Sequence, residues 1–407
     1  MQHVSRVRIA SISAILLATI AVLTHRAAHA ESALASFDLF EIERERILEK
    51  ASAYLDEAPL TVTAQRAERS AGGLHDFYSE GDYWWPDPEN PDGPYVRRDG
   101  ISNPANFVAH RRAMVRLSEI VATLTSAWVI TQEEVYASHA LEHLMAWFVD
   151  APTRMTPNLL YGQAIKGRVT GRSIGIIDTA HLVEVARSTE ILGRSGALPS
   201  GDLERIKDWF SDYLDWLTTH PYGKEERIHP NNHGVWWSMQ VAAFSSLVGR
   251  EAELEWIRNQ FKTVYLPEMM AADGSFPAEL RRTKPYGYSL FVLDGLAGVA
   301  QVASTEADDL WVFELPDGRS LRKGVSFLYP YIEDKSAWPY DKDVLYWDEW
   351  PVRHAFLLFA GLAYSKPEYL RVWESLDADP TTPEVVRNLP LRHPLLWVEN
   401  GKPRAER

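Results

Sequence analysis

Residues 114–124 read MVRLSEIVATL, and residues 136–148 read YASHALEHLMAWF. Apolar side chains recur at steps of three and four in both stretches: Met114, Leu117, Val121 and Leu124, then Tyr136, Ala140, Leu144 and Phe148. This spacing places them on one face of an α-helix. Thr131, with Glu134 three residues later, predicts a capping-box start for the second helix. Both stretches therefore predict amphipathic helices that pack on a common core.

The same periodicity continues along the chain. It predicts further helices over 39–55, 182–192, 203–217, 235–247, 254–264, 290–300 and 352–362. Gly and Pro concentrate in linkers at 86–94, 152–162, 220–234, 272–287 and 314–318, and only Trp311–Leu315 is expected as a short strand. The chain has no strict repeat of 34 or about 40 residues, and this absence argues against a solenoid. We predict an all-α fold with little β structure, an (α/α) toroid or barrel of roughly six to seven helical hairpins.

The first thirty residues have the pattern of a signal peptide. Arg6 and Arg8 precede an apolar core over 9–23, and Ala28-His29-Ala30 fits a small-x-small cleavage site. The apolar run is short for a membrane span. We expect cleavage near Ala30 and a periplasmic or secreted protein without stable membrane association, in which residues 31–407 form one domain.

Composition narrows the partners. The chain has no cysteine, so it has no disulfide or thiolate metal site. Its formal charge is −14, and loss of residues 1–30 would make it −17, which disfavours nucleic acid. Basic residues nevertheless gather over 97–172 and 281–284, where they could attract an anionic polysaccharide. The sequence leaves the oligomeric state open.

Two short segments carry chemistry. Residues 229–237 read HPNNHGVWW, with two amides and an imidazole just before a predicted helix. Residues 281–288 read RRTKPYGY and add fixed positive charge and phenols. An imidazole can carry a proton near neutral pH, and amides and guanidinium groups can bind a carboxylate. Together these groups suit an enzyme that removes a proton next to a carboxylate.

These residues also carry a resemblance to a known family. The Asn231-Asn232-His233-Gly element, Tyr83-Trp-Trp-Pro-Asp-Pro88, Gly171-Arg-Ser-Ile-Gly-Ile-Ile-Asp178 and Tyr346-Trp-Asp-Glu-Trp-Pro351 resemble the alginate lyase superfamily of polysaccharide lyases. The branch that they resemble most is polysaccharide lyase family 38. The resemblance covers most of residues 70–365. It implies an (α/α) toroid that cleaves uronic-acid polymers, alginate or glucuronan, by β-elimination without a cofactor or metal.

The resemblance also implies roles for individual residues. Asn232, His233 and Arg282 would neutralise the uronate carboxylate, with Arg281 as the alternative arginine. Tyr288 would act as base and then as acid, with Tyr286 as the alternative phenol. Since an unperturbed phenol has a pKa near 10, we expect Arg281, Arg282 and Lys284 to lower the pKa of Tyr288.

One phenol can serve both steps only if H5 and O4 lie on the same side of the sugar ring. Mannuronate and glucuronate satisfy this condition, and the sequence does not choose between them. Guluronate is inverted at C5, so its base must lie on the opposite face, where His233 could act. Endo or exo cleavage also stays open, because the loops at 86–103 and 314–345 would decide it.

Other polar and aromatic residues are candidates for binding the substrate. They are Asn158, Gln163, Arg168, Asn231, Trp236, Arg281, Trp84 and Trp85. Arg172 could instead anchor a loop by pairing with Asp178. Either Glu225 or Glu226 could hold His233 in one tautomer. Asn232 could simply cap the helix that follows it.

Three other classes of function compete with a lyase. A glycoside hydrolase on the same fold needs two carboxylates across the scissile bond, for which Asp348 and Glu349 are the available pair. An exported glycan-binding protein would need the aromatic and basic residues without the phenol. A metalloenzyme is the weakest alternative, because His139 and His143 lack the zincin glutamate after the first histidine.

Overall fold

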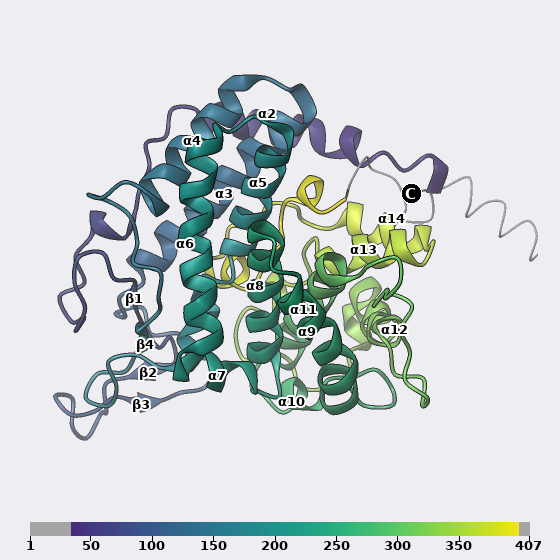
Figure 1. The fold of residues 1–407 in the computed structure, drawn as a ribbon. Helices are drawn as coiled ribbons and strands as arrows, with labels where there is room; N and C mark the ends of the chain where they lie inside the picture. Colours follow the sequence, from purple (N-terminus) through teal and green to yellow (C-terminus); the bar gives the residue numbers. More distant parts are fainter. Residues whose placement is uncertain (1–33, 399–407) are drawn as a thin grey trace, which may run out of the picture.

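The computed structural model describes residues 34–398, so the predicted signal peptide lies outside the described residues. Figure 1 shows the fold. The longer helices are α2 (Leu39–Tyr54), α3 (Ala109–Thr131), α4 (Glu134–Phe148), α5 (Leu182–Ser195), α6 (Ser200–Thr219), α8 (Asn232–Val248), α9 (Glu251–Gln260), α11 (Pro285–Ala303), α12 (Leu321–Glu333), α13 (Ala355–Ala363) and α14 (Pro367–Ser375). The shorter helices are α7 (Pro221–Arg227), α10 (Pro277–Leu280) and α15 (Pro383–Arg387), and a π-helix (Phe261–Met269) continues α9.

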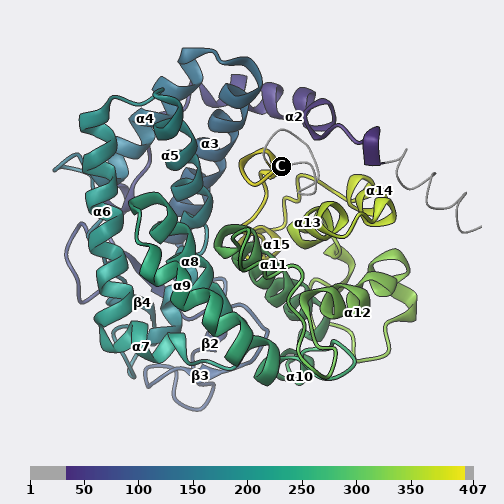
Figure 2. The same ribbon diagram turned by 45° about the vertical axis from the view of Figure 1, so that its right-hand side comes forward.

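The helices form a ring of hairpins. Helices α3, α5, α8, α11 and α13 each pack on the next, and their hairpin partners are α4, α6, α9, α12 and α14. In Figure 2, α8 and α11 lie between α6 on one side and α12 on the other. Helix α2 packs on α3, the first helix of this series. Residues 394–396 also pack on α3. The predicted all-α toroid is confirmed.

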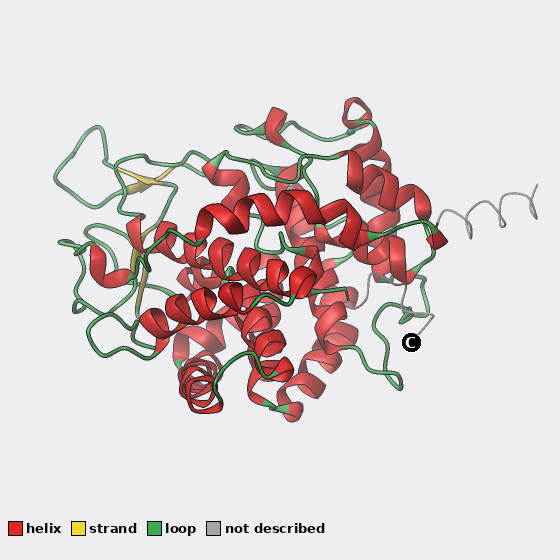
Figure 3. Ribbon diagram, turned by 90° about the horizontal axis from the view of Figure 1, so that it is seen from above, coloured by secondary structure: helices red, strands yellow, loops and turns green. Residues whose placement is uncertain are grey.

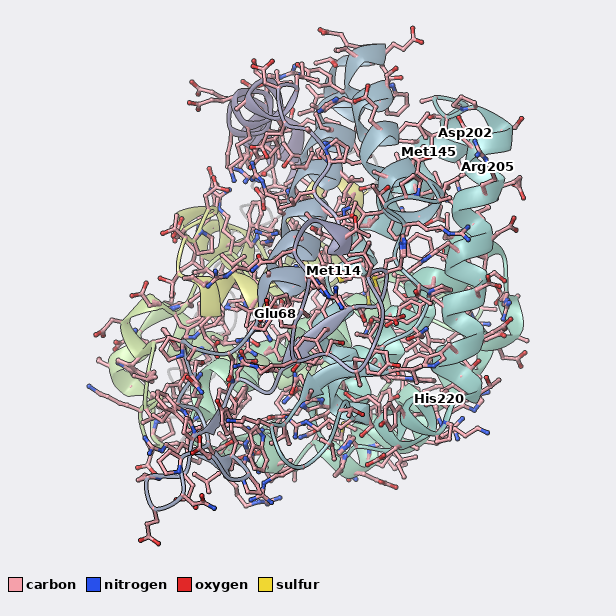
Figure 4. The ribbon with its side chains drawn as sticks, turned by 90° about the vertical axis from the view of Figure 1, so that its left-hand side faces the viewer. Glu68, Met114, Met145, Asp202, Arg205 and His220 are labelled. Carbon is pink, nitrogen blue, oxygen red and sulfur yellow. The ribbon has the colours of Figure 1, made fainter. Side chains whose placement is uncertain are left out.

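Burial explains why some helices line the inside of the ring and others the outside. Nearly every side chain of α8 and α11 is buried, so both helices are apolar on all sides, as core helices must be. Helix α6 buries only one stripe, which includes Trp209, Phe210 and Leu217. Its other face meets solvent, and Figure 4 shows Asp202 and Arg205 near its start and His220 at its end. Helix α3 alone among the described helices is long and apolar enough to cross a membrane, and it is mostly buried within the protein.

Four short strands shape one rim of the ring, where Figure 3 shows them as small arrows among long loops. They are β1 (Tyr78–Glu80), β2 (Trp84–Trp85), β3 (Val96–Arg97) and β4 (Tyr161–Ala164). Strand β1 pairs with β4 in parallel, and β2 pairs with β3 in antiparallel orientation. The first pairing brings residues 81–85 beside residues 161–178, although these segments are far apart in the chain.

Some predicted boundaries are wrong. Trp311–Leu315 forms a turn with a single β-bridge at Glu314, not a strand. Thr131 is the last residue of α3, since Gln132 has a left-handed conformation (φ 61°) that ends the helix, and α4 has no side-chain cap. The predicted linkers 220–234 and 272–287 contain α7 and α10 as well as the starts of α8 and α11. Helix α12 lies within the predicted loop 314–345, where Ser320 caps its start.

Candidate active site

A cavity of about 280 Å³ lies at the rim where α8 and α11 begin. The segment after β1, strand β4 and the residues before α5 complete its walls. Its lining includes Asp82, Tyr83, Trp84, Arg97, Gln163, Arg172, Asp178, His229, Asn231, Asn232, His233, Arg282, Tyr288 and Arg387. Both segments that the sequence singles out, 229–237 and 281–288, therefore contribute to one cavity.

The start of α8 gives the cavity its polar floor. Asn231 is the N-cap, and its Oδ1 accepts a hydrogen bond from the backbone N–H of His233 at 3.2 Å. Asn231, and not Asn232, therefore caps the helix with its side chain. The dipole at a helix start favours an anion nearby.

Glu279 in α10 fixes the orientation of Asn232. The backbone N–H of Asn232 donates to Oε1 of Glu279 at 2.7 Å, and its Nδ2 lies 3.0 and 2.9 Å from the two carboxylate oxygens. Only 1% of Glu279 is exposed, and this burial raises the pKa of its carboxyl. The contact determines which end of the Asn232 amide points away from the cavity wall. Nothing in the sequence motif indicated Glu279.

Glu226 fixes the orientation of His233. Its Oε1 lies 2.6 Å from Nδ1 of His233, and since a carboxylate can only accept, Nδ1 carries the proton. Nε2 of the same ring is then the atom left for a ligand. Of the two glutamates that the sequence offered, Glu226 is buried and makes this contact, whereas Glu225 is exposed.

The hydroxyl of Tyr288 lies among other polar groups in the first turn of α11. Its oxygen is 2.7 Å from the hydroxyl oxygen of Tyr83 and 3.4 Å from Nη2 of Arg282, whose guanidinium lies 4.5 Å from the Tyr288 ring centroid. Arg282 also bonds Asp99 at 3.0 Å. Arg281 is exposed and does not line the cavity, so the geometry separates the two arginines.

Arg282 acts on the pKa of Tyr288 in the expected direction, but the net shift is upward and not downward as expected. Burial raises the pKa of Tyr288 to about 12, and the charge of Arg282 and the hydrogen bond with Tyr83 only oppose that rise. Only 7% of Tyr288 is exposed, so the cost of burying a phenolate outweighs the attraction of the guanidinium. Lys284, expected to act on Tyr288, instead donates to Glu384 at 2.6 Å and to Tyr83 at 3.4 Å.

A buried ionic network supports Tyr83 and was not predicted. Arg387 donates to Glu384 at 2.8 Å and also pairs with Asp82. Arg111, near the start of α3, donates to the two oxygens of Asp82 at 2.6 and 2.9 Å. Burial alone would raise the pKa of Asp82, but Arg111 and Arg387 outweigh it and hold the value at about 2. Asp82 is therefore ionised at neutral pH.

Three predicted binding residues line the cavity: Gln163, Asn231 and Trp84. Gln163 has a positive φ of 49°, and its Nε2 donates to Asp178 at 3.1 Å. Its Oε1 accepts from Arg172 at 2.9 Å. The suggested Arg172–Asp178 pair is wrong, since Asp178 pairs with Arg111. Burial lowers the pKa of Arg172 to about 10, which still leaves a cation in the cavity wall.

The other predicted binding residues do not line the cavity. Trp236 is fully buried in the core, stacked on Phe291, and its indole N–H donates to the Phe291 carbonyl at 3.1 Å. The indole of Trp85 donates to the Ile101 carbonyl at 2.8 Å. The remaining three lie elsewhere: Asn158 accepts from the backbone of Leu160 in a turn, exposed Arg168 donates to the Tyr95 carbonyl and lies over Trp84, and Arg281 faces solvent.

The residues that a glycoside hydrolase or a metalloenzyme would need also lie outside the cavity. Asp348 and Glu349 are exposed and do not line the cavity. Nε2 of His139 and of His143 both lie near the carbonyl of Glu57, at 3.0 and 3.1 Å. Among residues 34–398 no group of three or more His, Cys, Asp or Glu side chains could hold a metal ion.

Comparison with known proteins agrees with this geometry. The alginate lyase family model matches residues 61–338, more than half of the chain. The chain belongs to the alginate lyase family. A crystal structure of an alginate lyase from Bacteroides ovatus is 31% identical, with a TM-score of 0.77 over 91% of this chain and 97% of that one. The enzyme is thus a polysaccharide lyase, and the predicted superfamily is confirmed.

More distant structures share the fold. Alginate lyase A1-III from Sphingomonas species A1 is 17% identical, with a TM-score of 0.51 over 90% of this lyase and 96% of that chain. A histidine-to-alanine variant of A1-III, complexed with a tetrasaccharide, is 16% identical with a TM-score of 0.54 over the same shares. No curated protein matches the lyase by sequence.

Proposed function

We propose that this lyase cleaves β-1,4-linked uronate polymers by β-elimination, with Tyr288 as base and acid. One observation carries the proposal: Tyr288, Arg282, Asn232 and His233 line the same cavity. A phenol, a guanidinium, an amide and an imidazole thus converge on a space that could hold one acidic sugar. Removal of a proton next to a carboxylate needs such a combination, because the carboxylate's own charge opposes formation of the carbanion.

The carboxylate would lie against the start of α8. Arg282 supplies a full positive charge. The Nδ2 of Asn232 bonds both oxygens of Glu279, so Asn232 would donate to the sugar carboxylate by exchanging that partner for the substrate. His233 is bound to Glu226 through Nδ1, and its Nε2 would face the sugar beside the buried Glu226. These groups stabilise the enolate-like intermediate more than the ground state, because its charge is concentrated on the carboxylate oxygens.

Proton transfer would run through Tyr288. Its phenolate takes H5 from the sugar, and the electron pair of that C–H bond first forms the enolate-like intermediate and then the C4=C5 double bond as the C4–O4 bond breaks. The protonated phenol then gives its proton to O4 of the leaving chain, so that base and acid are restored. Tyr83 supports the phenolate by donating a hydrogen bond to it across 2.7 Å.

Stereochemistry restricts the substrates of this arrangement. A single phenol requires H5 and O4 on one side of the ring, which holds for mannuronate and glucuronate. Polymannuronate is the first choice, since the similar Bacteroides ovatus protein is described as an alginate lyase. Guluronate would need His233 Nε2 as base, and the Glu226 contact favours this second activity by leaving Nε2 as the free nitrogen.

We also propose that the lyase is exported, with residues 1–30 removed, and that residues 31–407 act as one catalytic domain. The support is the basic start, apolar core and Ala28-His29-Ala30 site in the sequence. Mass spectrometry of the protein recovered from its native host would test the cleavage position.

A panel of polymannuronate, polyguluronate and glucuronan tests the main proposal. A lyase leaves an unsaturated sugar that absorbs in the ultraviolet, whereas a glycoside hydrolase releases reducing ends without that absorbance. Absorbance with polymannuronate or glucuronan is the expected result. Reducing ends without absorbance would establish a hydrolase, and binding without new ends would establish a glycan-binding protein.

A further inference from the structure

A second, larger cavity lies directly behind the active site. Its volume is about 610 Å³, within the roughly 300–1,000 Å³ usual for ligand sites. Asp82 and Arg387 belong to the walls of both cavities, so the two are separated there by one layer of side chains. Its other walls come from α2, α3, residues 102–106 and the C-terminal segment 378–393. The mechanism described above uses none of these other walls.

The charge of this cavity is opposite to that of the whole protein. Arg and Lys outnumber Asp and Glu seven to four among its lining residues, whereas the whole chain carries −14. Local excess of positive charge inside a low-dielectric cavity attracts an anion. The four carboxylates are all paired with lining cations, and Arg46 and Arg116 also pair with Glu43 and Glu57, so among the described residues Arg112 is the lining cation left without an acidic partner.

Two arginines hold unused hydrogen-bond donors here. Arg392 pairs with Glu119 through Nη1 at 2.6 Å. Its side chain is only 10% exposed, and its buried Nε and Nη2 have no hydrogen-bond partner. Arg112 is exposed in the first turn of α3, and its side chain has no hydrogen bond or ion pair within residues 34–398. Buried donors without partners cost free energy, so a guanidinium in this state is suited to a carboxylate ligand.

We propose that this cavity binds a uronate unit of an oligosaccharide, apart from the unit that is cleaved. The proposal rests on the proposed function, since it assumes an acidic polysaccharide as substrate. Arg392 binds the carboxylate inside the cavity, and Arg112 binds at its exposed mouth. The ligand is either a distant part of the bound polymer or a free oligosaccharide product.

The experiment compares Arg112→Ala and Arg392→Gln with Arg371→Ala. Arg371 is an exposed arginine of α14 that lines neither cavity and has no side-chain partner among the described residues, so it controls for the loss of one charge. Calorimetry measures the binding of short and long oligomannuronates to each variant in a Tyr288→Phe background, where cleavage should be at least about 100-fold slower. Loss of one charge-assisted hydrogen bond should weaken binding about tenfold.

The expected result is weaker binding in both cavity variants and no change in Arg371→Ala. If the ligand is part of the polymer, the loss of binding appears with long chains. The same substitutions in the otherwise wild-type enzyme then reduce the KM advantage of long over short substrates. If it is a free product, a disaccharide binds Tyr288→Phe at two sites and the cavity variants lose one. Cleavage by the wild type with unchanged binding in both cavity variants would overturn the proposal. Absence of cleavage of any uronate polymer by the wild type would instead overturn the proposed function.

Discussion

The hydroxyl oxygens of Tyr83 and Tyr288 lie 2.7 Å apart, and only one of the two can donate to the other. Burial raises the pKa of Tyr83 well above its ordinary value, and that of Tyr288 only to about 12. Tyr288 faces Arg282, whereas Tyr83 lies among Lys284, Arg387 and the carboxylate of Glu384. Because the proposed mechanism needs the phenolate at Tyr288, Tyr83 would donate the hydrogen bond between the two hydroxyls.

Replacement of Tyr288 by Phe should remove the proton carrier and leave the fold unchanged. General acid–base catalysis contributes about 10²- to 10⁴-fold, so kcat for polymannuronate should fall by at least about 100-fold. Tyr286→Phe is the matched control, because its hydroxyl donates to the carbonyl of Tyr331 at 3.0 Å and does not line the cavity. Initial rates of ultraviolet absorbance measure both. Equal activity of the two variants would refute the role of Tyr288.

The two adjacent arginines should differ in their effect on the pH profile. The charge of Arg282 lowers the pKa of Tyr288, so its removal raises that pKa further. Because elimination needs the phenolate, the rising limb of kcat/KM should move to higher pH in Arg282→Ala, and the maximal rate should also fall. Arg281→Ala should leave the limb in place, since Arg281 is exposed and lines no part of the cavity.

Profiles from about pH 6 to 11 would decide this, with circular dichroism to confirm folding at each end of the range. A rising limb at the same pH in Arg282→Ala and the wild type would mean that Tyr288 does not supply the titrating group.

The sequence predicted those parts of the site that are local in the chain. Asn232 and His233 are adjacent, and Arg282 and Tyr288 lie six residues apart at the start of one helix, so short motifs were enough. Tyr83 lies about two hundred residues from Tyr288. It reaches the site because β1 pairs with β4 at the rim of the ring where α8 and α11 begin.

The residues that the sequence missed share a reason. Glu384 and Arg387 lie about a hundred residues after Tyr288 in a C-terminal segment whose position depends on closure of the ring. Neither residue belongs to a periodic pattern. Trp236 was misassigned because an indole suits a sugar face and a core equally well. The apolar residues on every side of 235–247 were the available signal that this helix is buried on all faces.

The contact between Glu226 and His233 should matter for turnover more than for stability of the fold. Glu226→Gln keeps the shape of the side chain but removes the charge and can present an amide N–H to Nδ1, which would favour the wrong tautomer. Loss of a partner that orients a functional histidine typically costs about 10- to 100-fold, and we expect a fall in kcat of that size.

Glu225→Gln is the matched control, because Glu225 is the exposed neighbour and should retain full activity. The His233 imidazole proton, observed by NMR in both variants, would report the tautomer directly. An unchanged kcat in Glu226→Gln would mean that the orientation of His233 does not limit the reaction.

Asp82 should contribute stability that depends on pH. Its folded-state pKa of about 2 lies below the unfolded value of about 3.9, so the contribution is complete above pH 4 and disappears as the pH falls toward 2. Asp82→Asn leaves Arg111 and Arg387 without their shared carboxylate, which should cost about 3–5 kcal/mol at pH 7. Urea unfolding at pH 7 and pH 3 measures this cost, and the difference from wild type should shrink at pH 3 because Asp82 of the unfolded wild-type chain takes up a proton there while the folded carboxylate stays mostly ionised. Asp99→Asn, at a quarter-exposed ion pair, should cost no more than about 1 kcal/mol. An equal loss in both variants would mean that the buried network is not what holds this wall of the cavity.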